Sequence, residues 1–126
     1  MDIKSQNLVK LTGRISGIRF EYNSAGNLMH AVLTTATRFQ RVNGTTEVQK
    51  NNLDLIVFQR HNRTDLGTIR EGDIVTITGE IKNQPLVNAW TGRYARVLRI
   101  FVYEIAVLGS ASDNLLVEDT KAETFD

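Results

Sequence analysis

The stretch NNLDLIVFQ, residues 51–59, decides how the chain folds. Successive side chains of a β-strand point to opposite faces. One face of this stretch is uniformly apolar and predicts a buried core: Leu53, Leu55 and Val57. The other face is mixed and ends in an aromatic ring: Asn52, Asp54, Ile56 and Phe58. A strand with these two faces suits a small barrel that binds something flat and charged on its outer surface.

Similar alternation predicts four more strands along the chain. We expect strands at residues 8–20, 28–38, 51–59, 73–82 and 94–108. Gly13 and Gly17 interrupt the first of them, and glycine within a strand often marks a bulge or a bend. A long first strand bent at glycine is what a small barrel needs in order to close.

The segments between these strands predict the order of the fold. Residues 21–27 are rich in turn formers, and Asn43-Gly44 predicts a hairpin. Residues 60–72 show no alternation and could hold a short helix at 64–69, whereas 83–93 is a predicted loop. We therefore predict an all-β chain, a five-stranded OB-fold Greek-key barrel with a short helix or loop between strands three and four. Such barrels bind oligonucleotides or oligosaccharides on strands two and three and in the loops between strands 1–2 and 4–5.

Charge is unevenly distributed along the 126 residues. Residues 1–109 carry 14 Lys and Arg against 9 Asp and Glu, whereas residues 110–126 carry 1 Lys against 5 acidic residues. We interpret 1–109 as one folded, nucleic-acid-binding domain and 110–126 as a flexible acidic tail. The basic body favours a polyanion as its partner.

Several classes of protein are disfavoured by what the sequence lacks. It has no cysteine, no secretory leader and no apolar run near the ~20 residues that span a bilayer. We therefore expect a cytoplasmic protein with no membrane partner. His30 and His61 have no ligand partners at metal-binding spacing, and no nucleophile or phosphate-loop motif is present. We expect no metal, no cofactor and no enzymatic activity.

Motifs in four places resemble those of the bacterial single-stranded DNA-binding (SSB) proteins. NLVKLTGRI at 7–15 resembles the family's N-x-V-x-L-x-G-R-L opening, and LIVF at 55–58 resembles its V-V-L-F third strand. EGD at 71–73 and VTITGEI at 75–81 resemble its K-G-x and V-x-I-x-G-x-L, and IAVLG at 105–109 resembles the M-x-M-L-G that closes its domain. The resemblance implies an OB-fold that binds single-stranded DNA without sequence preference, usually as a dimer-based tetramer.

The chain also departs from that family's pattern. Asn52 stands where the family has a tryptophan, and Asp54 where a basic residue often follows. Phe39 and Trp90 lie near the places of two further family tryptophans. The tail lacks the family's glycine-rich spacer, and residues 123–126 only faintly echo its acidic tip. We expect weaker binding than in a typical member, or a shifted path of the strand, and a tighter complex after Asp54→Arg.

Binding without sequence preference needs aromatic rings for bases and a basic groove for phosphates. The stacking candidates are Phe58, Phe39, Trp90, Tyr94 and Tyr22. The phosphate candidates are Arg38, Arg41, Lys50, Lys82, Arg93 and Arg96, with Arg14, Arg19, Arg60 and Arg99 as further cations. Phe101 and Tyr103 lie in a dense apolar strand and are assigned to the core or to an interface.

Two functions fit these observations. The first is binding and protection of single-stranded DNA, or RNA, in replication, recombination or the transfer of plasmid or phage DNA. On this reading the protein is a homo-oligomer, a dimer or tetramer, and is encoded by a mobile element. The alternative is an OB-fold accessory module of replication that binds a partner protein and meets DNA only secondarily. The basic body and the surviving aromatic residues favour the first, and the two lost tryptophans favour the second.

Overall fold

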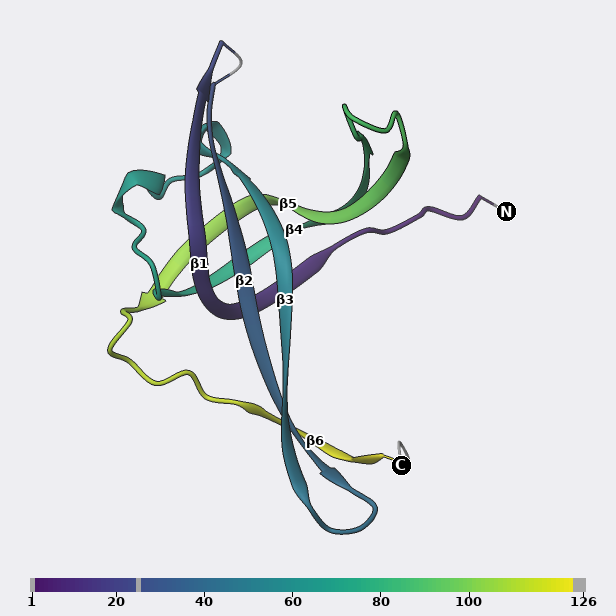
Figure 1. Cartoon of the computed structure of the whole chain (residues 1–126). Helices are drawn as coiled ribbons and strands as arrows, with labels where there is room; N and C mark the ends of the chain where they lie inside the picture. Colours follow the sequence, from purple (N-terminus) through teal and green to yellow (C-terminus); the bar gives the residue numbers. More distant parts are fainter. Residues whose placement is uncertain (1, 25, 124–126) are drawn as a thin grey trace.

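The structure, a computed structural model, describes residues 2–24 and 26–123 and is built almost entirely of β-strands (Figure 1). The strands are β1 (Val9–Asn23), β2 (Gly26–Arg41), β3 (Thr46–Phe58), β4 (Ile74–Val87), β5 (Tyr94–Gly109) and β6 (Glu118–Glu123). Two 3-10 helices lie between β3 and β4: η1 (Gln59–His61) and η2 (Leu66–Thr68). The predicted all-β class, and a short helical link between strands three and four, are confirmed.

The five long strands close into a barrel. Their order in the sheet is β1-β4-β5-β3-β2, and β1 returns to pair with β2. β1 can serve both edges because it bends: residues 9–14 pair with β4, residues 14–23 pair with β2, and the register shifts between Ser16 and Arg19. Gly17 sits in this shift with φ 61°. A side-chain carbon on Gly13 would collide with the Thr34 carbonyl. The predicted bend at these two glycines is confirmed.

The core fills the barrel with the inward side chains of the strands. Leu55 and Val57 are 1% and 0% exposed, as the alternation of β3 predicts, whereas Leu53 packs at the core's edge. Leu66 and Ile69, from the link between β3 and β4, contribute to the same cluster. Ile56 is also buried, although it lies on the outward side of β3, because the neighbouring β5 places Phe101 beside it.

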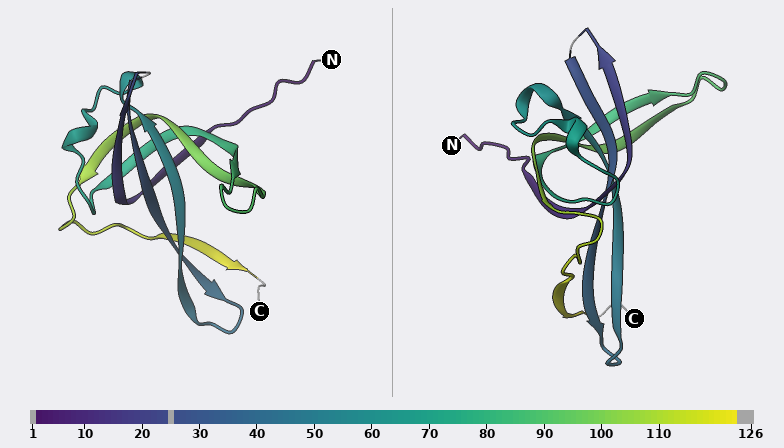
Figure 2. Two further views of the ribbon diagram at one scale, coloured as in Figure 1. Left: turned by 45° about the horizontal axis from the view of Figure 1, so that its top comes forward. Right: turned by 90° about the vertical axis from the view of Figure 1, so that its left-hand side faces the viewer.

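Two hairpin arms extend beyond the barrel (Figures 1 and 2). In the β2–β3 arm the pairing continues from Thr37 opposite Gln49 to Gln40 opposite Thr46. In the β4–β5 arm it continues from Lys82 opposite Arg99 to Val87 opposite Tyr94. The expectation that residues 83–93 are a loop is therefore wrong for 83–87. Pro85 is accommodated because its stretch of β4 pairs only with β5, so the missing N–H can face away from a partner.

The segment after Gly109 runs back past the barrel to the β2–β3 arm (Figure 1). The Arg14 guanidinium donates to the carbonyls of Gly72 (2.6 Å), Ala111 (3.3 Å) and Asp113 (2.8 Å). Beyond this anchor, β6 pairs in parallel with residues 37–41 of β2. The sequence did not predict this strand, and the flexibility expected of 110–126 stays a prediction. Residues 124–126, compared above with the acidic tip, lie outside the described residues.

The only helices of the described chain are η1 and η2, each a single turn long. Within residues 2–24 and 26–123, no helix has the length and apolarity needed to cross a membrane.

Candidate nucleic-acid interface

An aromatic pair occupies the outward face of the barrel. The Phe58 ring, at the end of β3, lies 5.9 Å from the Phe101 ring of β5, centroid to centroid, with an interplanar angle of 47°. The Lys82 Nζ atom sits 4.7 Å from the Phe101 centroid, within cation–π range. Phe58 therefore has the outward position that the sequence predicts. Of the two assignments given to Phe101, the core is wrong, because Ile100 and Val102 take the buried positions of β5 on either side of it, and an interface stays a prediction.

The same face carries an acidic group beside Lys82. The Glu80 carboxylate lies 3.1 Å from Lys82 Nζ. A hydrogen bond from the Tyr103 hydroxyl, followed by one from Lys82, holds the pKa of Glu80 below its ordinary value. The same hydrogen bond raises the pKa of Tyr103, because it is made to a carboxylate. Tyr103 is 41% exposed, so the core is also wrong for Tyr103, and an interface stays a prediction for it. Lys82 is thus a paired cation, held in place over an aromatic ring.

The tip of the β4–β5 arm presents a fully exposed indole. Trp90 is 96% exposed. The turn beneath it is fixed by the Asn88 side-chain oxygen, which accepts the backbone N–H groups of Trp90 (2.8 Å) and Thr91 (3.2 Å). Gly92, with φ 67°, closes the turn by donating to the Asn88 carbonyl at 2.8 Å. The backbone is therefore ordered around an aromatic side chain that covers nothing.

Three predicted site residues accompany Trp90 on this arm. Arg93 lies in the turn, and Tyr94 (61% exposed) and Arg96 begin β5. Among the described residues, the side chains of these three form no hydrogen bond or ion pair. The arm thus combines two exposed rings with two cations that have no internal anion to neutralise them.

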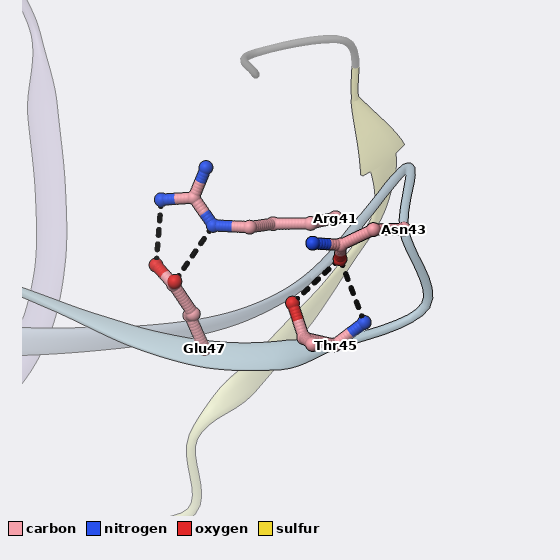
Figure 3. A network of polar contacts seen from close by, with 4 residues as sticks. All are labelled: Arg41, Asn43, Thr45 and Glu47. Atoms are coloured by element: carbon pink, nitrogen blue, oxygen red, sulfur yellow. Dashed lines mark hydrogen bonds and ion pairs between the residues drawn. The ribbon is translucent and has the colours of Figure 1, made fainter.

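On the β2–β3 arm, by contrast, a cation is paired with an acidic side chain of the chain itself (Figure 3). The Arg41 guanidinium grips the Glu47 carboxylate through Nε (2.7 Å) and Nη2 (2.8 Å). Its carbon Cζ lies 5.7 Å from the centroid of the half-buried Phe39 ring. The hydrogen bond and charge of Arg41 hold the pKa of Glu47 below its ordinary value. Asn43 shapes the turn by accepting from the N–H (3.0 Å) and hydroxyl (2.7 Å) of Thr45.

The other cations of this arm lie along its strands. Arg38 forms an ion pair with Asp119 of β6, at 3.6 Å. Lys50 is exposed and lies opposite Ala36. Because Arg38 and Arg41 both have acidic partners within the chain, a polyanion would have to compete for them.

Strand alternation divides the predicted site between two sides of the sheet. The pairing registers place four of the predicted residues on the outward side, where Phe101 also lies: Phe58, Lys82, Lys50 and Arg38. The residues on the opposite side are Phe39, Arg41, Tyr94, Arg96 and Tyr22. Tyr22 stacks on Phe20 at 6.4 Å near the β1–β2 turn. Trp90 and Arg93 lie in the turn between the two sides.

A hollow on the outward side was missed by reasoning from the sequence. Its volume is about 150 Å³, and its side-chain lining comes from four strands: Arg19 (β1), His30 and Val32 (β2), Asp54 (β3) and Arg99 (β5). Sequence reasoning named the two arginines only as further cations and gave His30 no role. Arg14, from the same group, serves instead as the anchor of the C-terminal segment. The described part of the chain has no group of three or more His, Asp or Glu side chains that could hold a metal ion.

The closed barrel, its strand order and the link between β3 and β4 define an OB-fold. Solved structures of single-stranded DNA-binding proteins share it. A Plasmodium falciparum SSB in complex with ssDNA superimposes with a TM-score of 0.73 at 17% identity, covering 86% of this chain and 99% of that one. A small single-stranded DNA-binding protein from Streptomyces coelicolor gives 0.56 at 16% identity, covering 79% and 92%. A mitochondrial single-stranded DNA-binding protein from S. cerevisiae gives 0.53 at 17% identity, covering 87% and 99%.

No family model matches the chain, and no curated protein matches it in sequence. At 16–17% identity, the likeness to the three solved structures concerns the fold. The SSB-like OB-fold that the motifs at 7–109 imply is confirmed.

Proposed function

We propose that the protein binds single-stranded DNA, or RNA, by stacking bases on exposed rings and by pairing phosphates with basic side chains. The observation that carries the proposal is the β4–β5 arm. It holds a 96% exposed tryptophan on an ordered turn, next to Arg93 and Arg96, whose side chains have no partner in the described chain. The exposed ring offers a flat apolar face beside two cations, which is the combination that binds single-stranded nucleic acids. Nucleic-acid bases have such faces, and their phosphates suit the neighbouring cations.

The outward face of the barrel supports the same proposal. Phe58 and Phe101 form a second aromatic platform, with Lys82 above it and Arg99 next to Lys82 across the β4–β5 pairing. The Plasmodium protein with a TM-score of 0.73 is an SSB in complex with ssDNA, so the shared fold supports this kind of ligand. Stacking accepts any base because every base has a π-face, and phosphate contacts carry no sequence information.

The biological setting follows from this chemistry as part of the proposal. A protein that covers single strands would protect them during replication, recombination or the transfer of plasmid or phage DNA. The 1–109 domain would be the binding unit, with replication proteins among its partners. We expect a homo-oligomer, a dimer or tetramer, because exposed strand edges favour self-association.

The test is a fluorescence titration of the protein with oligo-dT at several salt concentrations. The chain has 1 tryptophan, so the signal reports Trp90 alone. We expect quenching, an affinity that falls linearly with salt on a logarithmic scale, and little competition from duplex DNA. The slope counts the phosphates engaged, at about 0.7 per contact for a single strand. Absence of binding at low salt would overturn the proposal.

A second candidate is a module that binds a protein partner. The observation favouring it is the edge of β2, where residues 37–41 accept β6 as a parallel strand. Sheet edges that pair with an extended segment are a common mode of peptide recognition. This function predicts that oligo-dT leaves the Trp90 signal unchanged at low salt, which is the opposite of the outcome expected above.

A further inference from the structure

Asp54 is an acidic residue on the outward face, among the basic side chains that line the hollow. It lies on the outward side of β3, opposite Val32 of β2, and its neighbour Leu55 pairs with Ile100 of β5. Its side chain is exposed and forms no hydrogen bond or ion pair among the described residues. The hollow of about 150 Å³ opens beside it. An unpaired carboxylate at this position would repel the phosphates of a bound strand.

The other polar side chains around the hollow are two arginines and a histidine. Arg19 reaches it from β1, Arg99 from β5 and His30 from β2. Two of them are held by partners outside the hollow: Arg99 donates to Gln84 Oε1 at 2.8 Å, and His30 lies 2.9 Å from Glu21 Oε2. The Asp54 carboxylate therefore has no ion pair with these neighbours. The arginines can pair with phosphates. The Asp54 carboxylate between them needs a hydrogen-bond donor, which an ionised phosphate does not provide.

A carboxylate accepts hydrogen bonds and donates none. Among the bases, guanine presents two adjacent donors on its Watson–Crick edge, N1–H and the N2 amino group, which match the two oxygens of one carboxylate. Cytosine and adenine present one amino donor next to a ring acceptor. Thymine presents a single N–H between two carbonyl oxygens, and those oxygens would face the carboxylate. The aspartate therefore ranks guanine first and thymine last.

We propose that Asp54 reads one base of the bound strand and gives the protein a preference for guanine at that position. Arg19 and Arg99 take the phosphates on either side, and the Phe58–Phe101 platform stacks a neighbouring base. The inference rests on the proposed function and deepens it: most of the interface accepts any base, and one position discriminates. Asp54 then changes which base this face selects, in addition to repelling phosphates.

The test compares two labelled 20-nucleotide strands, dT20 and d(TG)10, by fluorescence anisotropy at one salt concentration. The alternating strand avoids runs of guanine, which fold on themselves. The wild type should bind d(TG)10 more tightly by about fivefold or more, the lower end of what a bidentate base contact contributes. Asp54→Asn should bring the two affinities within about twofold, both by weakening d(TG)10 and by tightening dT20. Asp2→Asn, which removes the same charge outside the barrel strands, should leave the ratio unchanged.

Three outcomes would overturn the inference. Equal affinity of the wild type for both strands would show that no position discriminates. A guanine preference that persists in Asp54→Asn would assign the preference to stacking. An Asp54→Asn variant that tightens both strands by one factor would make Asp54 a plain repulsive charge. Each of these leaves single-strand binding intact, whereas failure to bind either strand at low salt removes the proposed function itself.

Discussion

The two hairpin arms have similar architecture and opposite chemistry. Both are extensions of two barrel strands that leave the barrel (Figure 2), and most of their side chains are exposed. On the β2–β3 arm, Arg41 is bound to Glu47, Arg38 to Asp119, and β6 covers the edge of β2. On the β4–β5 arm, Trp90 and the cations around it have no such partners in the described chain. Under the proposed function, Arg38 and Arg41 must give up contacts within the chain to pair with phosphates, whereas Arg93 and Arg96 need not.

The largest expected difference between the arms comes from their aromatic residues. Trp90→Ala should weaken binding of a labelled dT20 by about 1–3 kcal/mol, or about fivefold to 150-fold, the range for loss of one stacked base. Thermal unfolding followed by circular dichroism should not change, because Trp90 is 96% exposed. Phe39→Ala should weaken binding less, since its ring is half-buried beside Arg41 and less available to a base.

This comparison has a clear way to fail. Equal losses from Trp90→Ala and Phe39→Ala would mean that the two arms contribute alike. No loss from Trp90→Ala, with binding intact, would place the strand elsewhere on the molecule.

The basic residues give the next largest contrast, measured as a salt slope. Replacing both Arg93 and Arg96 by alanine should reduce the slope of log affinity against log salt by about 1.4, at about 0.7 for each phosphate contact. The matched double variant, Arg38→Ala with Arg41→Ala, should reduce it by less, because those guanidinium groups already face Asp119 and Glu47. A steeper loss from the second pair would reverse the assignment of the arms.

The barrel could be predicted from the sequence because its strands have an inside. Leu55 and Val57 alternate with polar residues only because one face of β3 meets the core, and that signal gave strand, face and fold together. The bend of β1 was predictable for a related reason. A side-chain carbon at position 13 would collide with the Thr34 carbonyl, so the sequence has glycine there. Where burial constrains the side chains, the sequence records the structure.

The arms and the hollow could not be predicted, because burial does not constrain them. Residues 83–87 extend β4 without a core face, so no apolar alternation marks them as strand. The ion pair of Arg38 with Asp119 joins distant parts of the chain and depends on the pairing of β6 with β2. The hollow needs the parallel contact of β3 with β5, which brings Arg99 to Asp54. Such sites depend on register between strands, which individual strand patterns do not specify.

Removing an acidic group from the β2–β3 arm should make its charge pattern more like that of the β4–β5 arm. Glu47→Gln keeps the shape of the side chain and removes the anion that binds Arg41. Loss of this ion pair should tighten dT20 binding modestly, by about twofold to fivefold, as expected for breaking an exposed ion pair. Asp2→Asn serves as the control for net charge. If the two variants tighten binding equally, the effect is one of overall charge and Arg41 has no special position.

The smallest expected effect is a shift in the pKa of Glu47, which distinguishes the two arms without DNA. Arg41 lowers the pKa of Glu47 below its ordinary value of 4.5. A lowered pKa in the folded state means that the ion pair stabilises the arm above that ordinary value, and that this contribution is lost as the pH falls through the lowered pKa. Carboxyl NMR should therefore show Glu47 titrating below 4.5 in the wild type and near 4.5 in Arg41→Ala. Residues 83–97 contain no acid or histidine, so amide signals of the β4–β5 arm should not follow this titration. An unshifted Glu47 in the wild type would mean that its ion pair with Arg41 does not form in solution, and the charge difference between the arms would then rest on the pair of Arg38 with Asp119.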